Sequence, residues 1–150
     1  MIIRRARPGD KPAVLLLARA SATSFAVEQP AFDQAFDELL THPEAFLAVA
    51  EKDEQVAGYL LGFDHLTFFA NGRVAWVEEI MVSEAFRRQG VGRKLMEAFE
   101  AWAKVRQVKQ IALATRRAAD FYEALGYAES AAYFRKQIPT ISSLGATDEQ

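Results

Sequence analysis

The chain has 150 residues, enough for one globular domain, and 51% of them are hydrophobic, which is sufficient for a buried core. Its 18 basic and 20 acidic residues leave a formal charge of −2, so we expect neither a broad basic surface nor a nucleic-acid partner. The absence of cysteine excludes disulfides, thiolate metal ligands and a cysteine nucleophile in this sequence.

The sequence also argues against a membrane or metal-binding protein. The first residues lack the apolar run of a signal peptide, and no stretch of about 18 uncharged apolar residues could span a membrane. We therefore expect a cytoplasmic protein with no membrane partner. His42 and His65 lie far apart and outside any cluster with ligand spacing, so no metal site is expected.

The first third of the chain predicts a strand followed by two helices. Residues 2–7 (IIRRAR) are typical of a short edge strand, and residues 7–22 predict a helix with Asp10 as its N-cap and Pro12 in its first turn. Residues 28–41 place apolar side chains at helical spacing with acidic residues on the opposite side, which predicts an amphipathic helix.

Residues 45–83 predict three antiparallel strands. Two turn sequences, EKDEQ at 51–55 and ANG at 70–72, separate the apolar runs of this segment. The pair Asn71-Gly72 favours a hairpin because both residues tolerate a positive φ.

The remaining elements follow from a change in periodicity at Gly90. Apolar residues then recur every three to four positions, which predicts a helix of about four turns. Residues 109–115 predict a buried strand, residues 118–127 a helix closed by Gly126, and residues 127–138 one or two final strands.

The summed order is β-α-α-β-β-β-α-β-α-β-β. It predicts a single α/β (α+β mixed) domain over residues 1–138, with a central mixed, mostly antiparallel sheet of about 6–7 strands and helices on both faces. The strands before and after the long helix should be parallel neighbours joined by a right-handed crossover. Residues 139–150 are polar, and we expect a frayed tail there.

The sequence RRQGVG, residues 87–92, lies where a predicted strand meets the long helix. The first N–H groups of a helix are unpaired and partly positive, and Gly90 and Gly92 would let an anion approach them, although a simple tight turn would use the same glycines. A dinucleotide fingerprint requires a third glycine where Leu95 stands. A nucleotide P-loop requires Gly-Lys-Ser/Thr, which is absent after Gly92.

Residues 73–127 resemble the GNAT superfamily, the Gcn5-related N-acetyltransferases. The resemblance rests on VEEIMVSEAFRRQGVGRKLM followed by ATRRAADFYEALGY, in which residues 87–92 fit the superfamily motif Arg/Gln-x-x-Gly-x-Gly/Ala. Residues 1–70 match it only in the order of their elements. The resemblance implies the GNAT acyl-CoA N-acyltransferase fold, acetyl-CoA as cosubstrate and no metal.

The resemblance also implies how the cosubstrate is held. Main-chain N–H groups of residues 89–92 would bind the pyrophosphate of coenzyme A, residues 81 and 82 would pair with its pantetheine arm, and three arginines would either reach the phosphates or be merely solvated. Thr115 stands where the family often has asparagine, and Ala118 matches its small residue. The candidate cosubstrate contacts are Met81, Val82, Arg87, Arg88, Gln89, Gly90, Val91, Gly92, Arg93, Thr115, Ala118 and Tyr122.

Acetyl transfer to an amine requires a base, a donor for the oxyanion and an acid for the leaving thiolate. Similarity to polyamine-acetylating members suggests Glu78 and Glu79 as bases, acting directly or through water, although only one should face the substrate unless the strand bulges. The resemblance assigns the oxyanion to the Val82 N–H and the acid to Tyr122, for which simple packing is the alternative role.

We therefore predict an N-acetyltransferase that moves the acetyl group of acetyl-CoA, by direct attack in a ternary complex, to a primary amine. The amine would belong to a polyamine-like or other cationic small molecule, or to a peptide. Phe25 and Glu28, with Glu78 and Glu79, are the candidate substrate contacts. A non-catalytic acyl-CoA sensor or interaction module is the alternative. The sequence leaves the acceptor and the oligomeric state open, a homodimer included.

Overall fold

The computed structural model describes residues 1–22 and 24–141, and the chain divides into two compact units, Met1–Leu113 and Ala114–Gln150. The elements of the first unit are β1 (Ile2–Arg5), α1 (Lys11–Ser21), α2 (Gln29–Leu39), β2 (Ala45–Lys52), β3 (Gln55–Thr67), β4 (Gly72–Val82), α3 (Val91–Val105) and β5 (Ile111–Ala112), with short 3-10 turns at Pro8–Asp10 and Glu84–Phe86. The described part of the second unit contains α4 (Ala119–Ala124).

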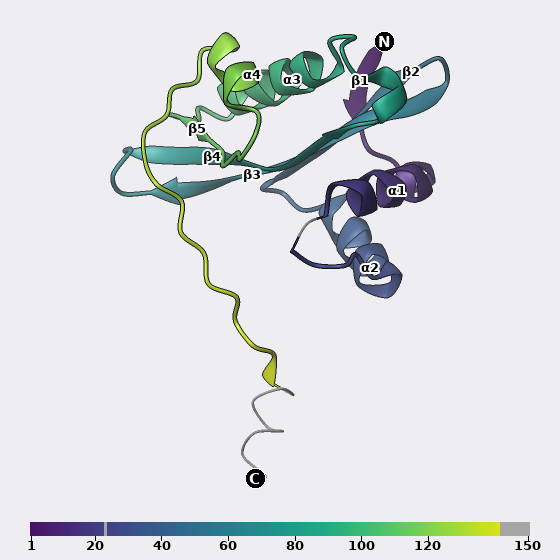
Figure 1. The fold of residues 1–150 in the computed structure, drawn as a ribbon. Helices are drawn as coiled ribbons and strands as arrows, with labels where there is room; N and C mark the ends of the chain where they lie inside the picture. Colours follow the sequence, from purple (N-terminus) through teal and green to yellow (C-terminus); the bar gives the residue numbers. More distant parts are fainter. Residues whose placement is uncertain (23, 142–150) are drawn as a thin grey trace. The chain divides into compact units, whose positions relative to one another are not determined.

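Within the described residues, five strands form one sheet in the order β1-β2-β3-β4-β5. The strands β1 to β4 are antiparallel neighbours, whereas β5 pairs with β4 in parallel, as a crossover through α3 requires. In the first unit α1 and α2 lie on one face of the sheet and α3 on the other (Figure 1). The predicted class, the mixed sheet and the helices on both faces are confirmed.

The prediction of 6–7 strands is wrong by one or two. Residues 127–138 form no strand in the described part of the chain, and β5 has two residues where residues 109–115 predict a longer strand. The aromatic residues Tyr127, Tyr133 and Phe134 favour a strand, but a strand also needs a neighbouring edge that pairs its N–H and C=O groups. Of the predicted tail, residues 142–150 lie outside the described residues.

Asp10 occupies the N-cap position of α1 as predicted, and the helix begins at Lys11 with Pro12 in its first turn, but the Asp10 side chain makes no capping hydrogen bond to this helix. Its carboxylate accepts two hydrogen bonds from the Arg4 guanidinium, at 2.8 and 2.9 Å, and one from the Arg7 backbone N–H at 2.7 Å. These donors, Arg4 first, lower the pKa of Asp10 against the opposing effect of burial. The carboxylate therefore ties β1 to the turn before α1.

One part of the hydrophobic core lies between the sheet and the helices α1 and α2. Phe32 and Phe36 of α2, at helical spacing in the sequence, pack into this region, and Phe36 is only 2% exposed. The buried members of this cluster are Val14, Leu17, Ala18, Phe36, Leu47, Val49, Tyr59 and Leu61. Both phenylalanines are thus core residues rather than surface contacts.

On the opposite face, α3 packs directly on the backbone of β3. A Cβ atom at Gly62 would lie 2.4 Å from the Phe99 ring, and one at Gly58 would lie 2.8 Å from the Met81 carbonyl oxygen. Phe99 itself is fully buried and stacks with Trp102 at a centroid distance of 5.4 Å. The absent side chains of β3 therefore allow the close approach of α3.

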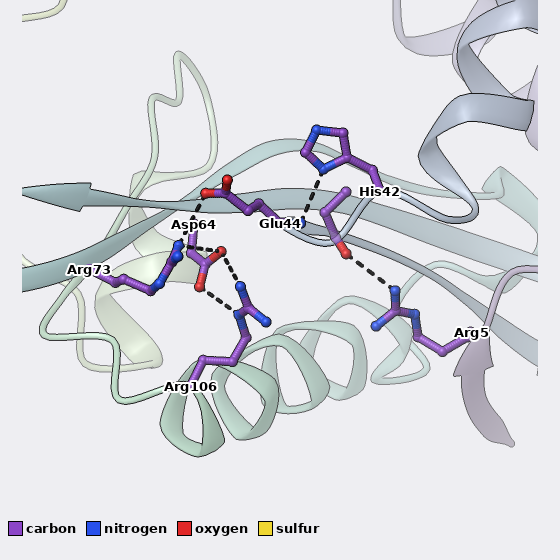
Figure 2. A network of polar contacts seen from close by, with 7 residues as sticks. Arg5, His42, Glu44, Asp64, Arg73 and Arg106 are labelled. Carbon is purple, nitrogen blue, oxygen red and sulfur yellow. Dashed lines mark hydrogen bonds and ion pairs between the residues drawn. The ribbon is translucent and has the colours of Figure 1, made fainter.

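A buried ion-pair network fixes the C-terminal end of α3 to this face (Figure 2). Asp64 of β3 is 1% exposed and accepts two hydrogen bonds from Arg106, at 2.6 and 2.8 Å. Arg73 of β4 lies 3.3 Å from Asp64 and donates to Glu44 at 3.1 Å. Because Arg106 directly follows α3, the network joins that helix to β3 and β4.

Replacing Gly62 by alanine should lower the free energy of unfolding by about 1–3 kcal/mol, because the new methyl group overlaps Phe99 and a carbonyl oxygen of β4. Urea denaturation at constant pH measures the change. Gly9→Ala is the matched control, since nothing lies within 4 Å of its Cβ position. Equal stability of the two variants would contradict the close packing of α3.

The Arg4–Asp10 pair should make stability depend on pH in the acid range. Because the folded-state pKa of Asp10 lies below its ordinary value of 3.8, its contribution is complete above that value and is lost as the pH falls through the lowered pKa. Asp10→Asn should therefore lower the thermal midpoint at pH 6. The midpoints of the variant and the parent protein should approach each other as the pH falls towards 2. The exposed Asp53 supplies the control, Asp53→Asn, which should follow the parent curve.

Candidate active site

The two edges of β4 are paired to different extents. One edge pairs with β3 from Gly72 to Val82, whereas the other pairs with β5 only at Ala75 and Trp76. Among the described residues, no strand pairs with this second edge from position 77 onwards. An extended ligand could therefore add to β4 there through main-chain hydrogen bonds.

Val82 directs its main-chain groups towards this unpaired edge. The N–H of Ser83 donates to the Ala57 carbonyl at 2.7 Å, and consecutive residues of an antiparallel strand point their N–H and C=O groups alternately to opposite edges. In agreement, the Val82 carbonyl accepts a hydrogen bond from Arg87 Nε at 3.4 Å. Met81 has the opposite orientation, pairs with Tyr59 of β3 and packs its side chain against the core.

A β-bulge in β4 brings the two glutamates to the surface together. The register passes from Gly62↔Val77 to Leu61↔Glu79, so Glu78 is the extra residue. Both Glu78 and Glu79 are exposed. The condition under which both could face a substrate, a bulge in the strand, is therefore met.

Glu79 lies on the face of the sheet that carries α1 and α2, because it pairs with Leu61 of that core cluster. Its Oε1 accepts a hydrogen bond from the hydroxyl of Tyr59 at 2.7 Å. Burial, followed by the charge of Glu79 and this hydrogen bond, raises the pKa of Tyr59, while the nearby Ser21 hydroxyl acts in the opposite direction. Sequence reasoning missed Tyr59, whose signal is a hydroxyl within the otherwise apolar run at residues 56–63.

The loop before α3 presents main-chain N–H groups. Gly90 precedes the helix with φ 79°, and Arg88 has φ 62°, so two residues of this short loop have the left-handed conformation. The first α3 turn closes from the Lys94 N–H to the Gly90 carbonyl at 3.1 Å, and the N–H groups of residues 89–92 bond to none of the described residues. Such an arrangement forms an anion site at the start of a helix.

The side chains around this loop are mainly basic. Arg87, Arg88 and Arg93 are exposed. The amide of Gln89 receives a hydrogen bond from Lys52 Nζ and donates to the Ala85 carbonyl at 3.4 Å. Lys52 lies at the end of β2, 37 positions away, and no local pattern in the sequence connects it to the loop.

Val91 and Gly92, the first two residues of α3, differ in how far they are buried. The Val91 side chain is 1% exposed and lies against the Cβ position of Gly58, so only its backbone is available to a ligand. Gly92 is half-buried, and around the Cβ position of Gly90 no atom lies within 4 Å. The open side of the loop is therefore at Gly90.

The candidate substrate contacts Phe25 and Glu28 lie between α1 and α2. Phe25 is 70% exposed, and Glu28 is exposed at the N-cap position of α2. Ser21 ends α1 and lies beside Tyr59, so the segment that carries Phe25 starts near the Tyr59–Glu79 pair.

The remaining candidates lie in the second unit. The Thr115 hydroxyl accepts a hydrogen bond from the Ala118 N–H at 3.1 Å and so shapes the turn before α4. Tyr122 is buried, with edge contacts to Phe121 at 4.9 Å and Tyr127 at 6.0 Å between ring centroids. Burial raises the pKa of Tyr122, which keeps its hydroxyl protonated at neutral pH.

The described residues contain neither a metal-binding cluster nor a membrane-spanning helix. No three or more of their His, Asp and Glu side chains form a group that could hold a metal ion. None of their helices has the length and apolar character needed to cross a membrane.

The chain matches the model of the Acetyltransferase (GNAT) family over residues 14–127. It therefore belongs to the GNAT acetyltransferase family, which uses acetyl-CoA as its cosubstrate. Among curated proteins it is similar to N-alpha-acetyltransferase 80 of Mus musculus, with 41% identity over 51 residues. That match covers 34% of this chain and 16% of the mouse protein, so the chain spans only about a sixth of that relative.

Solved structures confirm the GNAT fold. A transcriptional regulator from Bacillus halodurans has a TM-score of 0.82 at 26% identity and covers 91% of this chain and 99% of its own. Glucosamine-6-phosphate N-acetyltransferase from Arabidopsis thaliana has a TM-score of 0.82 at 21% identity over 92% and 98% of the two chains. An aminoglycoside 6'-N-acetyltransferase from Acinetobacter haemolyticus has a TM-score of 0.71 at 25% identity over 93% and 100%.

Proposed function

We propose that the protein is an N-acetyltransferase that moves the acetyl group of acetyl-CoA to a primary amine in a ternary complex. The observation that carries the proposal is the structure of β4, which combines an unpaired edge at Val82 with a bulge that exposes Glu78 and Glu79. A main-chain donor and two carboxylates thus lie within five residues of one strand. These are the groups that stabilise an oxyanion and accept the proton of an amine.

For the cosubstrate we propose the loop before α3 as the pyrophosphate site. Four consecutive N–H groups that bond to none of the described residues, the positive φ of Gly90 and the open space beside it fit a diphosphate. Exposed Arg87, Arg88 and Arg93 would add positive charge. The pantetheine arm would follow the unpaired edge of β4, with Met81 contributing little main-chain bonding there; Thr115 and Ala118 are further candidate contacts by resemblance to the family.

The reaction would proceed by direct attack. The neutral amine nitrogen forms a bond to the thioester carbonyl carbon, and its carbonyl oxygen becomes an oxyanion that accepts a hydrogen bond from the Val82 N–H. A glutamate of the bulge takes the proton of the amine, directly or through water. When the carbonyl re-forms, the C–S bond breaks and the thiolate takes a proton from the Tyr122 hydroxyl, a role assigned by resemblance to the family.

An amine with a positive charge and an apolar part is the acceptor that these residues favour. Glu28, Glu78 and Glu79 are exposed acids, and Phe25 is an exposed ring on the α1–α2 segment. The three named acetyltransferase relatives all act on nitrogen, on an N-alpha position, on glucosamine-6-phosphate or on an aminoglycoside, which supports an amine rather than a hydroxyl acceptor. We also propose a cytoplasmic location, supported by the cysteine-free sequence.

Gly90→Val should weaken acetyl-CoA binding at least about tenfold in isothermal titration calorimetry. A β-branched residue strains the backbone at φ 79°, and the relaxed loop would no longer aim its N–H groups at one anion. Gly9→Val is the matched control because its Cβ position is equally open and its φ is not positive. Unchanged affinity in Gly90→Val would remove the loop from the cosubstrate site.

Free coenzyme A released from acetyl-CoA in the presence of a panel of cationic amines measures turnover. Tyr122→Phe and Glu79→Gln should each lower kcat by about 10²-fold, because each removes one proton-transfer group. Glu123→Gln, on the exposed side of α4, should leave kcat unchanged. Tight acetyl-CoA binding without turnover on any amine would favour the alternative of a non-catalytic acyl-CoA sensor.

A further inference from the structure

We propose that Tyr59 is a positioning residue for acetyl transfer, which holds the Glu79 carboxylate by one oxygen and leaves the other oxygen to receive the proton of the amine. The inference rests on the proposed function, in which a glutamate of the bulge is the base. It also decides between the two glutamates, because it assigns the base to Glu79 and an accessory, substrate-attracting role to Glu78.

Tyr59 carries a hydroxyl in a buried, apolar environment. Its side chain is 2% exposed and lies among aliphatic residues of the α1 and α2 core, where a phenylalanine would satisfy the packing. A buried hydroxyl is unfavourable unless it is hydrogen bonded. Tyr59 meets this requirement through Glu79 Oε1 at 2.7 Å, so the hydroxyl serves the carboxylate rather than the core.

Tyr59, the hydrogen-bond donor to Glu79, is held rigidly in the sheet. Tyr59 lies within β3, which is paired on both edges, and it pairs with Met81, two positions from Glu79 on the same face of β4. Glu79 has a long side chain next to a bulge, where strand geometry controls direction poorly. A buried tyrosine with two side-chain torsions can therefore fix a glutamate that its own backbone leaves free to move.

Glu78 and Glu79 differ in their hydrogen-bond partners. Glu79 has this donor, whereas Glu78 has no hydrogen-bond or ion-pair partner among the described residues. With Oε1 of Glu79 occupied by Tyr59, Oε2 is the oxygen that remains for the amine proton. Placement of a base within hydrogen-bonding distance of the proton that it removes is what general-base catalysis requires.

Ser21 extends the contact to the helix that precedes the acceptor segment. The Ser21 hydroxyl donates to the Ala18 carbonyl at 3.0 Å, which fixes it to the last turn of α1, and it lies beside Tyr59, where it opposes the rise of the Tyr59 pKa. Tyr59 therefore connects β4 to the end of α1, immediately before the segment with Phe25 and Glu28. Tyrosine is ordinarily protonated at neutral pH, and the raised pKa of Tyr59 favours this donor form further, so Glu79 and not Tyr59 accepts the proton.

Tyr59→Phe tests the inference with the fastest amine of the panel. It should lower kcat by about tenfold, the cost expected when a catalytic group loses its orientation, while the KM for acetyl-CoA stays within about twofold of the parent value. The variant keeps the ring and should retain the thermal midpoint to within a few degrees. Tyr133→Phe, which makes the same chemical change at an exposed position, should be fully active.

A double-mutant cycle distinguishes positioning from a general structural effect. If Tyr59 acts only through Glu79, adding Tyr59→Phe to Glu79→Gln should lower kcat by no more than about 1.5-fold. A tenfold loss in both backgrounds would overturn the inference, because Tyr59 would then act independently of Glu79.

The remaining outcomes separate this inference from the proposed function. Impaired Glu79→Gln together with full activity of Tyr59→Phe would overturn only the role of Tyr59. Full activity of Glu79→Gln would overturn both the base and its positioning residue. Absence of turnover with every amine would overturn the inference together with the proposed reaction.

Discussion

The unequal pairing of the two edges of β4 is the constraint on which the rest of the site depends. β3 holds one edge over the whole strand, so the main chain is fixed, while β5 leaves the other edge after Trp76. A sheet normally covers such an edge, because exposed N–H and C=O groups invite pairing with another chain. Under the proposed function this open edge receives the extended cosubstrate, and the pairing with β3 keeps the main-chain groups of β4 fixed for it.

The packing of α3 extends this rigidity to the glycine loop. At its C-terminal end the helix is tied to Asp64 through Arg106, and in its middle Phe99 occupies the space left by Gly62. At its N-terminal end Val91 is buried against β3 while the backbone around Gly90 remains open. A helix fixed at three places along its length has a first turn that moves little. The N–H groups of residues 89–92 therefore keep their direction without a ligand.

Sequence reasoning was successful where the information is local. Periodicity located α1, α2, α3 and the first four strands, and the motif at residues 87–92 identified the family. It failed where a partner distant in sequence decides the outcome. Asp10 has the predicted N-cap position, but its carboxylate bonds to Arg4 instead of the helix. Tyr59 and Lys52 gain their importance only from Glu79 and Gln89, which are distant in sequence. The one or two strands predicted at residues 127–138 are absent for the same reason, since residue type alone cannot supply a neighbouring edge.

The extra residue in β4 also has a consequence for how the gene can vary. Because side chains alternate with a period of two, Trp76 and Glu79 share a face only by virtue of the residue inserted between them. Many amino acids could occupy position 78 without disturbing the sheet, since its side chain is exposed. Deletion of residue 78, in contrast, would move the side chains of one half of β4 to the opposite face of the sheet. Homologous sequences should accordingly vary in identity at this position while conserving the spacing around it.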